Sequence, residues 1–353
     1  MTRSRPDPSL SSQGDGYLPP VDALTGESQP PEVQLPETQS PEPLYPHLHP
    51  ETVALLDCDD ETRIHHASKA EFIEHSRAAQ ILAALDRLYR QPLQDRMDGL
   101  LIAGPTFCGK TSLARYFESN HPRDANLGGD HVIQPVAYTL APDEPNVTRL
   151  IELILKAMGG AHLSNEKPET VRERMLTSAA ACGLKVLLLD EIHGILNGTP
   201  KKQRLLMTTL KNLSNEMKIN IVLLGTREAF IATMGAEELQ TRFPVEWLPA
   251  WQDDAEFKGL LRGFERQLPL RRPSNLKDFS ARLYTLCSGS LGWLSRLLTR
   301  AAEVAISTGE ERITSQVLDR VVLEGWLSPD RRDELRRQAL GLEGPDAAGS
   351  VPA

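Results

Sequence analysis

Apolar residues in this chain recur with two different periods, and the two alternate along the sequence. Residues 76–89 place Ile81, Leu82, Leu85 and Leu88 three or four positions apart, which predicts an amphipathic helix. Residues 99–104 form a short apolar run bounded by glycines. Such a run predicts a buried strand that leads into a loop.

Strand and helix patterns then alternate as far as residue 225. We predict strands over 131–140, 185–189 and 219–225, and helices over 146–158, 170–182 and 201–217. Strands separated by helices favour an α/β fold in which a parallel sheet has helices on both faces and right-handed crossovers.

Beyond residue 249 the apolar pattern changes to helices alone. Helices are predicted over 253–267, 275–287, 291–308 and 314–326, and Thr314 is a plausible cap for the last of them. We therefore expect an α/β domain over 51–249 and a small all-helical domain, or lid, over 250–340. Residues 341–353 are small and polar, which predicts a flexible C-terminal tail.

The first fifty residues have a different composition from the rest. They contain 11 of the 26 prolines and a net charge of −5. Such a segment buries too little apolar surface to fold, so we predict a disordered tail over 1–50. It is either a solvated leader or a segment that captures a partner protein, and the sequence leaves both open.

Composition excludes several classes of protein. No run approaches the roughly 18 apolar residues of a membrane span, and the N-terminus lacks the apolar core of a secretory signal, so we expect a cytoplasmic protein. The four cysteines are too far apart for a zinc site or a disulfide framework. The net charge of −9 argues against coating nucleic acid by bulk charge, although the chain after residue 50 is only −4.

A phosphate-binding loop follows the first strand. Residues 104–111 fit G-x-x-x-x-G-K-[ST] between an apolar strand and a helix, which is the context that this motif requires. Its backbone N–H groups would cradle phosphates of ATP, Lys110 would neutralise the β- and γ-phosphates, and Thr111 would bind Mg²⁺. The predicted nucleotide-binding residues are Gly104, Pro105, Thr106, Phe107, Cys108, Gly109, Lys110, Thr111 and Ser112.

Two later strands end in polar residues. The strand over 185–189 runs into Asp190 and Glu191. Asp190 would hold Mg²⁺ through water, and Glu191 would polarise the attacking water. Thr226, after the strand over 219–225, is either a γ-phosphate sensor or a helix cap.

An arginine beside an aromatic residue occurs further along, at Arg242 and Phe243. A guanidinium can supply transition-state charge to a neighbouring subunit's nucleotide, so Arg242 is the candidate arginine finger in trans. The alternative is a solvated charge at a helix end.

Taken together, these residues resemble the AAA+ ATPases and, within them, the TniB-like transposition proteins, relatives of the TnsC and phage Mu B target-DNA regulators. The resemblance runs from residue 49 to about 322 and includes Asp190-Glu-Ile-His193, residues 211–216, Leu223-Leu-Gly-Thr-Arg-Glu-Ala229, residues 248–251 and residues 268–270. It implies an AAA+ P-loop NTPase that needs ATP and Mg²⁺ and forms a ring or filament on double-stranded target DNA. There it would recruit or activate a transposase, and hydrolysis would disassemble it.

One position departs from the wider AAA+ pattern. The helical domain often presents an arginine in a Gly-x-x-Arg context, but here Gly292 follows Gly289 at that spacing. Arg296, one helical turn later, is the candidate substitute for this contact with the nucleotide.

Basic residues that could follow a DNA backbone fall into three groups. We favour Lys201, Lys202 and Arg204, and also Arg149 and Lys156, over the arginines between 262 and 272. A nucleotide-switched protein that acts on protein partners alone is the competing hypothesis, and a helicase loader or motor is the third. ATP-dependent, salt-sensitive DNA binding would separate the first two.

Overall fold

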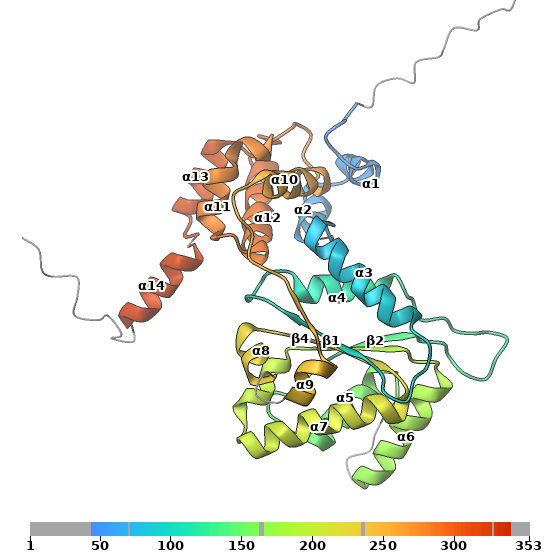
Figure 1. Cartoon of the computed structure of the whole chain (residues 1–353). Helices are drawn as coiled ribbons and strands as arrows, with labels where there is room; N and C mark the ends of the chain where they lie inside the picture. Colours follow the sequence, from blue (N-terminus) through green and yellow to red (C-terminus); the bar gives the residue numbers. More distant parts are fainter. Residues whose placement is uncertain (1–43, 70, 162–165, 234–236, 327, 340–353) are drawn as a thin grey trace, which may run out of the picture. The chain divides into compact units, whose positions relative to one another are not determined.

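A computed structural model of the chain describes residues 44–69, 71–161, 166–233, 237–326 and 328–339 (Figure 1). Most of the predicted N-terminal tail and the predicted C-terminal tail lie outside these residues. Residues 44–50 are described: Leu48 is buried, and His49 N–H donates to the carbonyl of Arg266 over 3.0 Å. The end of the segment predicted to be disordered is therefore packed against the helical domain.

A five-stranded sheet forms the α/β part, with the order β2-β3-β4-β1-β5. All four strand pairs are parallel, as predicted. The strands are β1 (Gly99–Ala103), β2 (Val136–Leu140), β3 (Val186–Asp190), β4 (Asn220–Gly225) and β5 (Val245–Trp247). The sequence did not predict β5, because three residues with a central glutamate carry no apolar run.

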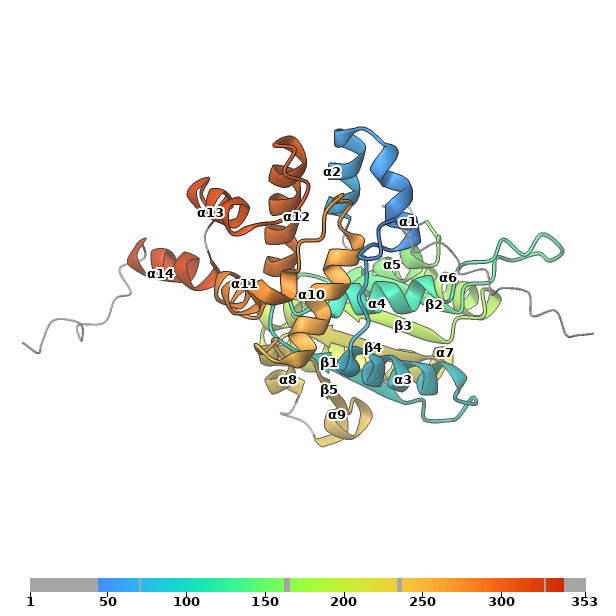
Figure 2. The same ribbon diagram turned by 90° about the horizontal axis from the view of Figure 1, so that it is seen from above.

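Helices cover both faces of the sheet, and alternate residues of each strand enter separate cores (Figures 1 and 2). Leu100 and Ile102 face the core under α3 (Ser76–Arg90) and α4 (Lys110–Ser119). Leu101 and Ala103 face the opposite core. That core is closed by α5 (Val147–Ala157), α6 (Pro168–Ala181) and α7 (Pro200–Met217). Strands buried on both faces explain the continuous apolar runs of the sequence.

The helical part has a core of its own. It is built from α10 (Ala255–Gln267), α11 (Ser280–Cys287), α12 (Leu291–Ser307) and α13 (Ser315–Leu323). The side chain of Thr314 accepts a hydrogen bond from the N–H of Val317, so the predicted cap of α13 is confirmed. The remaining elements are α1 (Pro50–Val53), η1 (Ala54–Asp57), α2 (Asp60–Ser68), η2 (Ile192–Asn197), α8 (Arg227–Thr233), α9 (Glu237–Arg242), η3 (Leu276–Phe279) and α14 (Pro329–Ala339).

Helix α2 packs against α12, although the sequence analysis assigned it to the α/β domain (Figure 2). Ala67 belongs to the helical core, and the guanidinium of Arg63, which solvent does not reach, pairs with Glu311. Arg63 also donates to the carbonyl of Pro269. The chain therefore contributes to the helical part before it enters the sheet.

Candidate nucleotide site

The loop between β1 and α4 has a backbone that its glycines make possible. A Cβ on Gly104 would lie 2.2 Å from the carbonyl oxygen of Leu248, and Gly109 has a φ of 102°. Phe107 also lies in the left-handed region, with a φ of 59°. The first glycine is thus needed for close approach and the second for backbone conformation.

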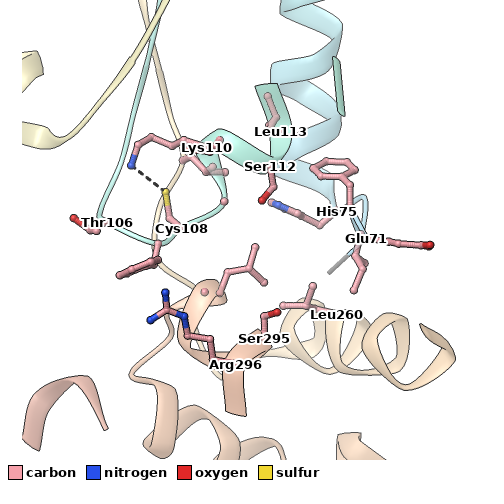
Figure 3. A pocket seen from close by; sticks show the side chains of 18 of the residues that line it. Glu71, His75, Thr106, Cys108, Lys110, Ser112, Leu113, Leu260, Ser295 and Arg296 are labelled. Carbon is pink, nitrogen blue, oxygen red and sulfur yellow. Dashed lines mark hydrogen bonds between the residues drawn. The ribbon is translucent and has the colours of Figure 1, made fainter. Parts of the chain in front are cut away.

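Lys110 is buried, and its ammonium lies inside the curve of this loop. Its Nζ donates to the carbonyl oxygens of Gly104, at 3.0 Å, and Pro105, at 2.7 Å. Burial raises the pKa of the neighbouring Cys108 thiol, although Lys110 opposes this shift, so the thiol stays neutral. Lys110 is therefore the cation that an anion in this loop would meet (Figure 3).

Asp190, at the end of β3, is 1% exposed and accepts hydrogen bonds from three groups. Thr111 Oγ1 and Tyr138 Oη both donate to its Oδ2, at 2.6 and 2.8 Å, and the N–H of Glu191 donates to Oδ1. Burial first, and then the nearby Asp190 charge, raise the pKa of Tyr138, which keeps its hydroxyl a donor. The sequence analysis missed Tyr138, which the pairing of β2 with β3 brings there.

The oxygen atoms of Thr111 and Asp190 are the kind of ligand that Mg²⁺ prefers. Within the described residues, no group of three or more His, Cys, Asp or Glu side chains is placed to hold a metal ion. The residues fit an Mg²⁺ ion that is shared between a few protein oxygens and a nucleotide phosphate.

Glu191 has a left-handed backbone, with φ 58° and ψ 35°, which turns the chain away from the direction of β3. Its side chain is about half exposed and lines the cavity described next, together with His193 and Thr226. The Thr226 side chain is hydrogen bonded to the Glu228 carboxylate, and this hydrogen bond is the main cause of the lowered pKa of Glu228. The ends of β1, β3 and β4 thus bring Lys110, Asp190, Glu191 and Thr226 to one edge of the sheet.

A cavity of about 620 Å³ extends from the phosphate loop to the helical part. Figure 3 shows the loop on one side of it, and Ser295 and Arg296 of α12 on the other. Its apolar wall comes from residues that the sequence analysis did not assign to the site: Phe72, Ile73, Leu248, Leu260, Phe264 and Leu291. No motif could have found them, since they come from four separated segments.

Contacts across the cavity explain the glycine at 292. The N–H of Gly292 donates to the carbonyl of Phe107, and a Cβ at this position would lie 2.8 Å from the Phe107 side chain. The guanidinium of Arg296 lies over the rings of Phe107 and Trp293, at 4.9 and 5.2 Å from their centroids. Arg296 therefore lines the cavity from α12, and its contact with the nucleotide stays a prediction.

The structure does not place Arg242 as a finger. Arg242 is 2% exposed, and its guanidinium donates to Ser214 Oγ and Asn215 Oδ1 of the same chain. A finger has to present its guanidinium to another subunit, whereas this one links α9 to α7. The sequence pattern identified an arginine at a helix end but could not show which way its side chain points.

Comparisons with known proteins agree with this architecture. The model of the family described as bacterial TniB protein matches residues 63–253, which is more than half of the chain. The chain belongs to the TniB family. No curated protein matches its sequence.

Solved structures show that this TniB family member has the AAA+ P-loop fold predicted from the sequence. It resembles the ORC2 protein of Aeropyrum pernix with a TM-score of 0.55 and 18% identity over 73% of this chain and 71% of that chain. It also resembles Cdc6p of Pyrobaculum aerophilum, with a TM-score of 0.54 and 14% identity over 76% of this chain and 71% of that chain. The ORC1 protein of A. pernix, solved in complex with DNA, has a TM-score of 0.53 and 16% identity over 72% of this chain and 66% of that chain.

The basic residues of the family member fall at two ends of the sheet. Arg149 lies in the first turn of α5, and Lys201 and Lys202 lie in the first turn of α7. The segments that precede these two helices are joined by a hydrogen bond from Asn197 Nδ2 to the carbonyl of Asp143. Arg204 is one turn further along α7, whereas Lys156 is at the opposite end of α5. All five are exposed, and Arg149 pairs with Glu152.

Within the described residues, no helix combines the length and apolar character needed to cross a bilayer.

Proposed function

We propose that this chain is an ATP-dependent DNA-binding regulator of transposition. It would assemble on double-stranded target DNA, recruit or activate a transposase there, and leave when ATP is hydrolysed. The observation that carries the proposal is a cavity joining the phosphate loop, the Asp190–Glu191 pair and the helical part, in a chain of the TniB family. The disassembly step and the transposase partner are expectations from that family.

The residues of the cavity divide the chemistry among them. The loop N–H groups and Lys110 would bind the phosphates, and Arg296 would approach from α12. Mg²⁺, held by Thr111 and Asp190, would supply charge neutralisation for the transferred phosphoryl group. Glu191 would accept the proton of the attacking water, and Thr226 would hold that water in place.

DNA binding is expected along the edge that carries Arg149, Lys201 and Lys202. These side chains are exposed and lie in the first turns of α5 and α7, the helices that follow the carboxyl ends of β2 and β3 along the chain. Affinity from phosphate contacts depends on salt, and many subunits on one duplex would add up their weak contacts. The net charge of −9 fits weak binding by an isolated subunit.

The test is fluorescence anisotropy of a labelled random-sequence duplex, with and without Mg-ATP, at two salt concentrations. Wild type should bind only with nucleotide, Lys110→Ala should not bind, and Glu191→Gln should stay bound. Lys277→Ala, which removes an exposed lysine of η3, is the matched control and should behave as wild type. Lys201→Glu should weaken binding more than Lys156→Glu.

One result decides against the proposal, and a second decides against the assigned DNA-binding edge. If wild type hydrolyses ATP but does not bind DNA under any of these conditions, the chain is a switch that acts on protein partners alone. If Lys201→Glu and Lys156→Glu weaken binding equally, DNA binding remains but the assigned edge is wrong.

A further inference from the structure

His193 is the residue of the Asp190-Glu-Ile-His193 block that the proposed chemistry leaves without a role. Its neighbour Ile192 is fully buried in the core beneath the sheet. A Cβ on Gly225 would lie 2.7 Å from Ile192 Cγ2, so the glycine at the end of β4 makes room for this side chain. Because Ile192 is anchored in this way, Glu191 and His193 on either side of it both line the cavity.

The two side chains meet in the cavity. Nδ1 of His193 lies 3.0 Å from Oε2 of Glu191. Solvent does not reach this nitrogen and, in the part of the chain that the structure describes, it makes no aligned hydrogen bond. A carboxylate can only accept, so the ring nitrogen has to carry the proton, and a small rotation of the half-exposed Glu191 side chain would align the bond.

An unpaired buried donor next to an acceptor calls for an explanation, because leaving it unpaired costs about 1–3 kcal/mol. We propose that His193 is a positioning residue: it holds one oxygen of the Glu191 carboxylate, so that the other faces the water that attacks the γ-phosphate. This inference rests on the proposed function, in which Glu191 takes the proton of that water.

A second carboxylate lies near the same imidazole. The pKa of Glu228 is lowered mainly by the hydrogen bond from Thr226 and, to a smaller extent, by the nearby His193. Helix α8, which carries Glu228, packs against η2, which carries His193. Thr226, Glu228, His193 and Glu191 thus form one polar group that spans the ends of β4 and β3.

The same contact has an opposite interpretation, in which His193 restrains Glu191 in a resting position. Removal of the imidazole would then raise the rate of hydrolysis. We favour positioning because Glu191 and Thr226 already line the same cavity as the phosphate loop while the contact is in place.

The experiment measures steady-state ATP hydrolysis by the full chain, with Mg-ATP and with DNA. His193→Ala should lower kcat about tenfold, which is less than the roughly hundredfold or more that a proton-transfer group itself contributes, because His193 only positions that group. Its Kd for a fluorescent ADP analogue should stay within about twofold, since positioning acts on the chemical step. His193→Gln, which retains an N–H donor, should recover part of the rate. His65→Ala, which removes an exposed imidazole of α2, is the matched control.

Measuring the effect of His193→Ala in the Glu191→Gln variant separates a positioning role of His193 from a structural role. There, His193→Ala should lower the residual rate no further, because both residues act on one step. A wild-type rate or a higher rate in His193→Ala overturns the inference, and so does an equal loss in both backgrounds. If wild type itself does not hydrolyse ATP, the proposed function fails first. If Glu191→Gln abolishes hydrolysis and His193→Ala does not change it, only the role of His193 is refuted.

Discussion

The two halves of the nucleotide site are built on different principles. The sheet half takes its polar side chains from the ends of β1, β3 and β4, which lie side by side because the sheet is parallel. The helical half takes its walls from α10, α12 and the segment before α3, which only side-chain packing brings together. The sheet half therefore concentrates charge and hydrogen bonds, whereas the helical half supplies apolar surface and one guanidinium.

The largest expected effect tests the sheet half. Asp190→Ala should lower kcat on the order of a thousandfold, because charge stabilisation by a bound metal contributes several kcal/mol. The measurement is ATP hydrolysis over a range of Mg²⁺ concentrations. Excess Mg²⁺ should not restore the rate, and a rate within tenfold of wild type would remove Asp190 from the metal site.

Next in size is a change of stability rather than of catalysis. Arg242→Ala should lower the free energy of unfolding by about 2–3 kcal/mol, because it leaves Ser214 and Asn215 without a buried charged donor. Thermal unfolding measures it, with exposed Arg204→Ala as the control. If the melting temperature is unchanged but hydrolysis by mixed oligomers is lost, Arg242 acts between subunits after all.

The contrast between the two halves also explains which elements and site residues the sequence could predict. The loop at 104–111 and the Asp190–Glu191 pair follow apolar strands, so local pattern revealed both the element and the chemistry. Strand β5 has no such pattern, and the inward orientation of Arg242 depends on α7, some 28 positions earlier. Tyr138 and Phe72 became visible once strand order and packing were known.

A third prediction tests the helical half. Gly292→Arg restores the arginine of the wider AAA+ pattern, yet it should weaken nucleotide binding about tenfold. The new Cβ would meet the Phe107 side chain at 2.8 Å, and such overpacking costs about 1–3 kcal/mol. Titration with a fluorescent ADP analogue measures the affinity. Combining Gly292→Arg with Phe107→Gly, which removes both the Cβ and the ring that the new Cβ would meet, should restore binding; if it does not, the clash is not the cause.

The smallest effect tests how far the sheet half depends on a residue outside its motifs. Tyr138→Phe removes the hydroxyl that donates to Asp190 but keeps the ring, over which Arg115 lies at 3.5 Å from the centroid. One hydrogen bond to a charged group contributes about 1.5 kcal/mol at the low end, so kcat should fall roughly tenfold or less, with little change in nucleotide affinity. Tyr138→Ala, which removes the ring as well, should also lower the melting temperature. If Tyr138→Phe hydrolyses ATP as wild type does, Thr111 and the backbone N–H of Glu191 suffice to orient Asp190, and the sheet half is complete within its motifs.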